Sequence, residues 1–443
     1  MKRLRVLISA HECSPEQGSE CAVGWNIATR MAAYHDVTVL AAAGSQFQPN
    51  SYREAISRYL DMNGRIPGLR FVFVEQPAVT IRTARVNSRL MRLTGGIGWQ
   101  LLYYRGLDAW LASAFRKASE LGLRNFDVVH QLTPISFRRP GHFWRSGLPF
   151  YWGPINGMYQ VRPAFIGYGG PASFLFETLR NSSITLHTRS ASFREAVAAA
   201  RRIWTVSENE AQVVNGISPG RASLMIDAAP PTRSEGRLRT YDGNRPLRLC
   251  WSGSHEPFKA LPLLLHALAR LPERRHVILD VLGDGRETAR WRALAESLRL
   301  NTVTWHGRLS YDDALATMGT ADMLVHTSLR EAASMAVLEA LGAGMPVVCH
   351  DICGMAVAVD HSCGVKVPLV DPERSIRGFR DAIGRFLRTP KQVTGLSAGA
   401  LRRAQELSWD AKVREIALAY HDGRQAAPMN EVTAQRPAEA LVS

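Results

Sequence analysis

Residues 329–348 read LREAASMAVLEALGAGMPVV, and this stretch decides the fold of the second half of the chain. The apolar run before it predicts a buried strand, the small and apolar residues after Glu331 predict a helix, and Pro346 begins the next apolar run. A strand, a helix and a strand in this order are typical of a parallel α/β sheet. Glu331 lies at the turn from strand to helix, and seven residues separate it from Glu339 inside the helix.

The start of this helix is a candidate ligand site. The first amide groups of a helix have no partner inside it and therefore suit a phosphate group. Because helical side chains lean towards the N-terminus, we expect Glu339 to reach the same pocket as Glu331. This arrangement suits a ligand with hydroxyl groups on both sides of a phosphate, such as a nucleotide sugar. Spacing alone leaves open a solvated glutamate on an ordinary helix.

Short apolar runs alternate with helical patterns over both halves of the chain. The alternation predicts two doubly wound α/β domains that face a central cleft, where such folds bind ligands. Proline, glycine and scattered charges at 227–246 indicate a linker between them. We therefore expect domains at 1–226 and 247–424, the last helix being able to cross back to the first domain, and a disordered tail at 425–443.

The composition is globular, with 443 residues, of which 46% are hydrophobic and 21% charged. The net charge of +15 suggests phosphorylated ligands, an anionic membrane or nucleic acid as partners. No apolar run reaches the ~18 residues of a membrane helix, and the first one is too short for a signal peptide, so we expect a cytoplasmic protein. The six cysteines lack zinc spacing and are expected to be buried thiols.

Further motifs extend this pattern along the chain. In the second half they are Gly283-Asp284-Gly285 and residues 305–309, 321–323 and 362–367. Together with residues 329–348 they resemble the E-x7-E signature of glycosyltransferase family 4, whose members are retaining enzymes of the GT-B fold. In the first half, Gly18-Ser19-Glu20 and residues 152–157 resemble loops of a bacterial polysaccharide branch. The resemblance covers about residues 4 to 420 and implies two Rossmann-like domains, the first binding the acceptor and the second the nucleotide sugar.

The resemblance also implies roles for residues of the second domain. Glu339 is expected to bind the ribose hydroxyls and Glu331 to contact the transferred sugar. Lys259 matches the lysine that neutralises the diphosphate. Many family members have arginine where this chain has Ser254, so we expect the second cation to come from Arg308 or Arg330. The remaining candidate donor-binding residues are Ser334, Met335, Ala336, Arg308 and Arg330.

Two histidines of the first domain are candidates because each ends a predicted strand. Many family members carry His-x-His where this chain has His130 and Leu132, so His130 is either functional or a support for its loop. His11 lies beside the loop of Gly18, Ser19 and Glu20 and is expected to face the acceptor. The alternative for both is a hydrogen-bonded structural histidine.

The resemblance implies a hexosyltransferase that moves a hexose from a nucleotide diphosphate sugar to a saccharide or polyprenyl-linked saccharide in cell-surface polysaccharide biosynthesis. It implies no cofactor and no metal, because helix dipole and cations stabilise the leaving diphosphate in GT-B enzymes. One alternative is a nucleotide-sugar epimerase of the same fold. Another is a basic nucleic-acid-binding protein, although no recognised module is present and we expect no nucleic acid partner.

A basic segment predicts contact with a membrane surface. Its arginines are spaced by 3, 4 and 3 residues, which places them on one face of a helix, and aliphatic and aromatic residues follow them. We expect this face to bind an anionic membrane surface peripherally, while the alternative is a solvated arginine face. The residues are Arg82, Arg85, Arg89 and Arg92.

Overall fold

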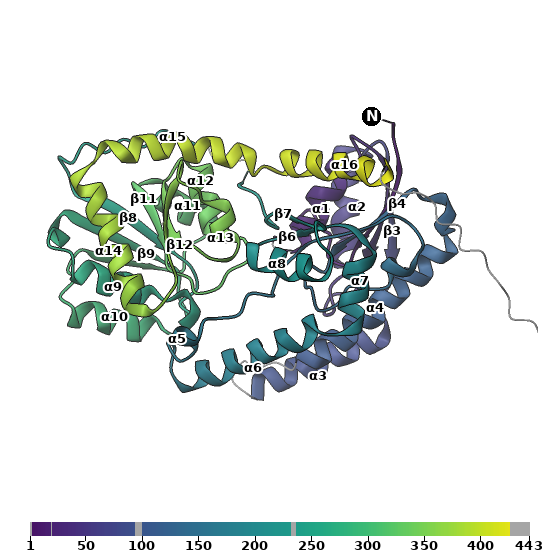
Figure 1. Ribbon diagram of the computed structural model, residues 1–443, viewed down its shortest axis with the longest axis horizontal. Helices are drawn as coiled ribbons and strands as arrows, with labels where there is room; N and C mark the ends of the chain where they lie inside the picture. Colours follow the sequence, from purple (N-terminus) through teal and green to yellow (C-terminus); the bar gives the residue numbers. More distant parts are fainter. Residues whose placement is uncertain (1, 19, 94–99, 232–235, 426–443) are drawn as a thin grey trace, which may run out of the picture.

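The computed structural model describes residues 2–18, 20–93, 100–231 and 236–425. The chain forms two α/β domains that lie next to each other, each built on a parallel sheet (Figure 1). This architecture confirms the predicted pair of doubly wound domains. Ser19 and all but the first residue of the predicted tail lie outside the described residues.

Within the described residues, the first domain has a parallel sheet of seven strands in the order β3-β2-β1-β4-β5-β6-β7. Its central strands β1, β4 and β5 are almost wholly buried because helices cover both faces of a parallel sheet. The strands are β1 Arg5–Ala10, β2 Asp36–Ala42, β3 Leu69–Val74, β4 Val128–Thr133, β5 Phe150–Ile155, β6 Ala200–Thr205 and β7 Ala222–Leu224. The helices are α1 Glu20–Met31, α2 Ser51–Asn63, α3 Ala78–Leu93, α4 Gln100–Glu120, α5 Pro163–Ile166, α6 Pro171–Thr188, α7 Ala191–Ala199 and α8 Glu208–Ile217.

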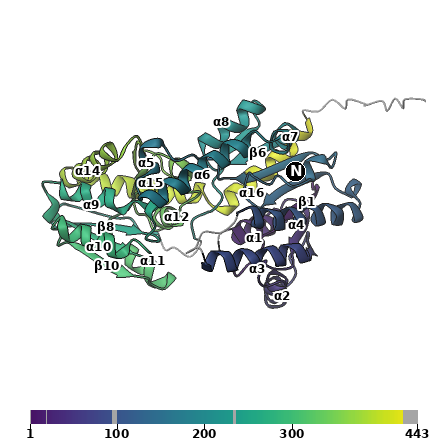
Figure 2. The same ribbon diagram turned by 90° about the horizontal axis from the view of Figure 1, so that it is seen from below.

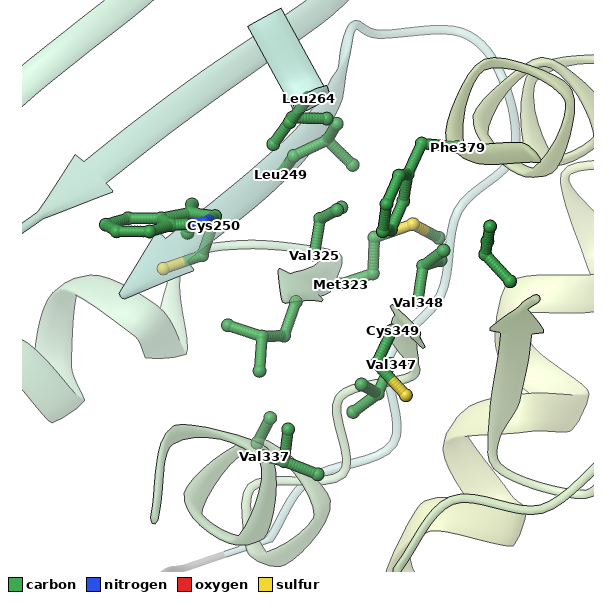
Figure 3. Close-up of a cluster of buried hydrophobic side chains, with 14 of the residues drawn as sticks. Leu249, Cys250, Leu264, Met323, Val325, Val337, Val347, Val348, Cys349 and Phe379 are labelled. Carbon is green, nitrogen blue, oxygen red and sulfur yellow. The ribbon is translucent and has the colours of Figure 1, made fainter. Parts of the chain in front are cut away.

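The second domain has a parallel sheet of six strands, counted over its described residues, in the order β10-β9-β8-β11-β12-β13. Phe379 and Val337 pack towards the side chains of β11 and β12 (Figure 3). The strands are β8 Leu247–Ser252, β9 Val277–Leu282, β10 Val303–Gly307, β11 Met323–His326, β12 Val347–His350 and β13 Gly364–Val367. The helices are α9 Leu261–Ala269, α10 Thr288–Ser297, α11 Tyr311–Gly319, α12 Met335–Gly342, α13 Cys353–Ala358, α14 Pro372–Arg388, α15 Lys391–Glu406 and α16 Trp409–Gln425.

Two segments pack on the domain to which they do not belong in sequence. Tyr159 and Phe165 follow β5 of the first domain, yet they belong to the buried cluster of the second domain. In the opposite direction, α15 and α16 run along the upper edge of the molecule from the second domain to the first (Figure 1). Val413 and Tyr420 of α16 are buried in the core of the first domain, and the Tyr151 hydroxyl donates to the carbonyl oxygen of Ala419 at 3.0 Å.

The segment 227–246 connects the two domains, but its ends are not free. Asp227 and Arg239 are both buried. The guanidinium of Arg239 donates to the carbonyl oxygen of Ala343 at 3.2 Å. Composition alone therefore describes this segment incompletely, because it contributes a buried carboxylate to the cleft between the domains.

Candidate functional site

A pocket of about 460 Å³ lies between the two domains. The second domain contributes the loop after β8 and the start of α12, and the first domain contributes the start of α1 and the segments after β4, β5 and β7. The pocket therefore lies at the carboxyl ends of parallel strands, where α/β folds bind ligands. Its lining residues include Glu20, Ile135, Asn156, Asp227, Gly253, Lys259, Glu331, Ala333, Ser334, Met335, Ala336 and Glu339.

Lys259 and Glu331 form the charged centre of this pocket. Lys259 is the last residue of a short 3-10 turn, Pro257–Lys259. Its Nζ forms an ion pair with Oε2 of Glu331. Nε2 of the buried His326 lies 3.6 Å from the same oxygen. Burial raises the pKa of Glu331, but the hydrogen bond from His326 and the charge of Lys259 outweigh it and lower the pKa to about 2. Glu331 is therefore ionised at every physiological pH, and a cation is held beside it.

The start of α12 forms the floor of the pocket. Ser334 is the N-cap, yet its side chain makes no capping hydrogen bond, so it leaves the first amides of the helix uncovered. Glu339 projects from the same helix into the same pocket, as the sequence predicts. Burial raises the pKa of Glu339, against a hydrogen bond from the Tyr311 hydroxyl that lowers it. The predicted neighbourhood of Glu331 and Glu339 is thus confirmed, and the amides of Met335 and Ala336 lie beside it.

Three predicted donor residues lie elsewhere. Ser254 and Arg308 are exposed and do not line the pocket, although Gly253 does. The Arg330 Nε donates to Oε1 of Glu177 on α6 at 2.9 Å, and its guanidinium lies 4.2 Å from the centre of the Phe258 ring. Arg308 is exposed to solvent and lies outside the pocket in this structure, so a role as the second diphosphate cation stays a prediction. Arg330 faces a second cavity instead.

In the first domain, Glu20 is the residue of the predicted acceptor loop that lines the pocket. Its carboxylate accepts a hydrogen bond from the backbone amide of Ile135. Burial raises the pKa of Glu20 well above the usual carboxyl range, and the charge of Glu12 raises it further. Glu20 is therefore a hydrogen-bonding group close to neutral charge. Gly18 is exposed and does not line the pocket.

The two predicted histidines are buried inside the first domain. Nε2–H of His130 donates to the carbonyl oxygen of Gly153 at 2.7 Å, and Nδ1 accepts from the Tyr420 hydroxyl at 2.6 Å. Nε2 of His11 lies 3.1 Å from Nε2 of Gln76. Burial lowers the pKa of both histidines to about 4. This geometry favours the supporting role for His130, because both of its ring nitrogens are occupied far from solvent.

Asp227 is a cleft residue that the sequence analysis assigns to the linker. Its Oδ2 accepts from Nδ2 of Asn156 at 2.6 Å, and its Oδ1 accepts from the amide of Ala333 at 3.1 Å. Burial is the main cause that raises its pKa. The available signal is its place directly after the apolar run 222–226, since a polar residue after a strand points into the cleft.

The described residues contain neither a disulfide bond nor a cluster of metal-ligating side chains. All six cysteines are buried and unpaired, as expected. No group of three or more His, Cys, Asp or Glu side chains in the described ranges is placed to hold a metal ion. The pocket therefore offers a lysine, helix amides and carboxylates as its chemical groups.

The second domain matches a known family. Residues 243–401 match the family model described as glycosyl transferases group 1. This region is therefore similar to group 1 glycosyl transferases. It contains Lys259, Glu331 and Glu339, so the charged centre of the pocket lies inside the matched residues.

The chain is also similar to curated glycosyltransferases. The chain is 37% identical to lipopolysaccharide glucosyltransferase WaaG of Escherichia coli K12 over 34% of this chain and 40% of WaaG. It is 28% identical to a D-inositol 3-phosphate glycosyltransferase of Geodermatophilus obscurus over 71% of this chain and 70% of that protein. Two of the relatives, WaaG and a D-inositol 3-phosphate glycosyltransferase of Streptomyces griseus, are matched over less than half of their own length.

Solved structures show the same fold. The crystal structure of Anabaena Alr3699/HepE in complex with UDP and glucose is similar with a TM-score of 0.55, 14% identity and coverage of 95% of this chain and 100% of that chain. At this identity the likeness concerns the fold alone. The GT-B fold, predicted from the sequence, is therefore confirmed.

Proposed function

We propose that this protein is a retaining glycosyltransferase of the family 4 type, which transfers a hexose from a nucleotide diphosphate sugar to a hydroxyl of a saccharide or lipid-linked saccharide. The observation that carries the proposal is the convergence of Lys259, Glu331 and Glu339 on one pocket at the start of α12. Lys259 and the helix amides supply positive charge for a diphosphate, and Glu339 supplies a carboxylate for ribose hydroxyls.

In the proposed reaction, Lys259 and the start of α12 act on the diphosphate. The bond between the sugar carbon and the diphosphate oxygen breaks, and a bond forms between that carbon and the acceptor hydroxyl. Lys259 and the amides of α12 stabilise the negative charge that develops on the diphosphate. The departing phosphate oxygen takes the acceptor proton, so the step needs no metal and no covalent nucleophile. Attack on the face from which the phosphate leaves retains the configuration.

The relatives suggest which substrates to test first. The name of WaaG gives it as a lipopolysaccharide glucosyltransferase, and HepE holds UDP and glucose in its structure. We therefore place UDP-hexoses first among donors and an acceptor in cell-surface polysaccharide or exopolysaccharide biosynthesis first among pathways. No cofactor is required by this proposal.

A donor screen tests the proposal. UDP, GDP and ADP and their glucose conjugates are added to the full chain, and the unfolding temperature is measured, because a ligand that binds only the folded state raises it. We expect one nucleotide to stabilise the wild type and to stabilise Lys259→Ala less. Stabilisation by none of them contradicts the proposal.

Two follow-up measurements separate the alternatives. The product of the preferred donor, followed by NMR, distinguishes transfer or donor hydrolysis from an epimerised nucleotide sugar. A gel shift with DNA and RNA tests the nucleic-acid alternative. Binding of nucleic acid without any nucleotide-sugar turnover contradicts the enzymatic function.

We also propose a peripheral site on the inner membrane surface for the cytoplasmic enzyme, where polyprenyl-linked acceptors are found. The four predicted arginines lie on α3 and are all exposed, and Leu93 beside them is 82% exposed. Apolar side chains on α6, among them Leu175, Leu179 and Leu186, are also exposed. Both helices run along the lower edge in Figure 1, which Figure 2 views from below. In the described part of the chain, no helix is long and apolar enough to cross a membrane.

Vesicle binding tests this surface. Each cation near an anionic surface contributes ~1 kcal/mol, so four give weak, salt-sensitive binding. We expect the protein to sediment with phosphatidylglycerol vesicles at low salt, and not with phosphatidylcholine vesicles. Serine at all four α3 positions should abolish this binding, whereas serine at four exposed α14 positions should not. The control positions are Arg374, Arg377, Arg385 and Arg388. Absence of wild-type binding at low salt contradicts the membrane proposal alone.

A further inference from the structure

A second cavity, of about 220 Å³, lies against the donor pocket. The two share Asn156, Glu331 and Ala332 in their walls, so Glu331 faces both. Both domains contribute to the second cavity, with Arg180 from α6 and Arg330 from the loop before α12. A group bound here is therefore a neighbour of whatever Glu331 contacts in the donor pocket.

The second cavity is lined by two arginines, Arg180 and Arg330, and by two glutamates, Glu210 and Glu331. Arg330 donates to Oε1 of Glu177 at 2.9 Å, whereas Nη1 of Arg180 lies 3.7 Å from Oε2 of the same carboxylate. Over the described residues, this Nη1 has no hydrogen-bond partner, although the Arg180 side chain is only 15% exposed. One carboxylate thus serves two guanidinium groups.

Neighbouring groups do not supply the missing negative charge. Glu331 is already paired with Lys259. Glu210 lies in the cavity wall, but burial raises its pKa to about 7, so it carries only part of a charge at neutral pH. Another cation, Arg138, lies close to the wall residue Gly157. Its Nη1 is 3.4 Å from the point that a Cβ atom would occupy if Gly157 carried one. Burial and then the charge of Arg330 lower the pKa of Arg180 to about 10.

We propose that this cavity binds an anionic substituent, a carboxylate or a phosphate, carried by one of the two sugar substrates. A planar guanidinium with unused N–H groups matches both anions and forms charge-assisted hydrogen bonds with them. The shared wall at Glu331 is the reason to expect the anion on a sugar rather than on an unrelated ligand. The inference rests on the proposed glycosyltransferase function and specifies its substrate class.

The test compares charged and neutral sugars on each side of the reaction. In the donor arm, the affinities of UDP-glucuronate and UDP-glucose are measured by calorimetry on the full chain. In the acceptor arm, glucose 1-phosphate, glucuronate and methyl glucoside are titrated in the presence of saturating UDP, with inorganic phosphate as a separate probe. We expect a preference of about tenfold or more for the charged sugar in one arm, as for a charged hydrogen bond.

The variants show whether Arg180 causes this preference. Arg180→Gln should remove it, and Arg180→Lys should keep part of it. Arg189→Gln, an exposed position at the end of α6, should leave it unchanged. UDP affinity checks in every variant that the donor pocket is intact.

The outcomes separate the two proposals. Failure of UDP and every other nucleotide to bind the wild type refutes the proposed function. Normal UDP binding with no preference for charged sugars in either arm refutes the anionic cavity, as does a preference that survives Arg180→Gln. Binding of inorganic phosphate alone, without either charged sugar, contradicts its assignment to a sugar substrate.

Discussion

The two walls of the donor pocket are built on the same kind of sheet but differ in charge. On the wall of the second domain, Lys259 neutralises Glu331 and the amides of α12 remain free for an anion. On the wall of the first domain, burial raises the pKa of Glu20 and of Asp227, although the charge of Lys412 lowers the pKa of Asp227 in part. The second domain therefore contributes a fixed ion pair, and the first domain contributes carboxyl groups that burial makes harder to ionise.

This difference indicates a division of work. A fixed cation and helix amides favour the charged diphosphate in both the ground and transition states and favour it most when it leaves. The carboxyl group of Glu20, whose pKa burial raises strongly, can donate and accept hydrogen bonds with hydroxyl groups without repelling the diphosphate. Substitutions on each side of the pocket test this division, and they are given from the largest expected effect to the smallest.

Removal of the lysine should have the largest effect. Lys259→Ala removes the cation beside Glu331 and is expected to lower turnover by about 100-fold or more, the loss seen for an electrostatic donor. Arg308→Ala is the matched control, because Arg308 is exposed outside the pocket, and its turnover should stay near the wild type. Initial rates at saturating donor measure both. A large loss in Arg308→Ala means that the cleft closes further around the donor.

The ribose carboxylate should come next. Glu339→Gln keeps the shape but weakens charged hydrogen bonds worth ~1.5–3 kcal/mol, which corresponds to about 10- to 150-fold in donor affinity. Calorimetry with the preferred nucleotide measures this change. Unchanged donor affinity in Glu339→Gln would falsify its assignment to the ribose.

The buried carboxyl group of Glu20, on the wall of the first domain, should make the stability of the protein depend on pH. Glu20 has a raised pKa in the folded state, so its stabilising contribution is complete at acidic pH and is lost as pH rises beyond the ordinary carboxyl range. Glu20→Gln should therefore flatten the decline in unfolding temperature towards alkaline pH. Glu54→Gln, at an exposed position on α2, should leave the decline as it is. An equal decline in the two variants contradicts the buried neutral state of Glu20.

The smallest effect on catalysis is expected from His130. Burial lowers its pKa to about 4, so its contribution to stability is complete above the ordinary value of 6.5 and is lost as pH falls towards 4. His130→Gln should lower the unfolding temperature at pH 7 and make its fall with acid shallower. Turnover per folded molecule should change little. A large loss of turnover at unchanged stability restores the catalytic assignment.

The sequence predicts the fold and the pocket residues of the second domain better than the pocket residues of the first domain. Glu331, Glu339 and Lys259 lie on short segments whose local structure, a turn into a helix, fixes where they point. His11 follows β1 as expected, but His130 lies inside β4 rather than at its end, and α16, about 290 residues further along the chain, covers it through Tyr420. Such a contact leaves no local pattern in the chain. The place of Asp227 in the cleft could not be predicted either, because the proline and glycine residues that follow it are typical of an ordinary linker.

The exchange of segments between the domains has a consequence for engineering. Tyr159 and Phe165 complete the core of the second domain, and α16 completes the core of the first. A chimera joined at residue 246 would combine two incomplete cores, each exposing apolar surface that its own chain normally covers. Donor specificity in proteins built this way is therefore best exchanged by grafting loops, such as residues 252–259, into an intact chain.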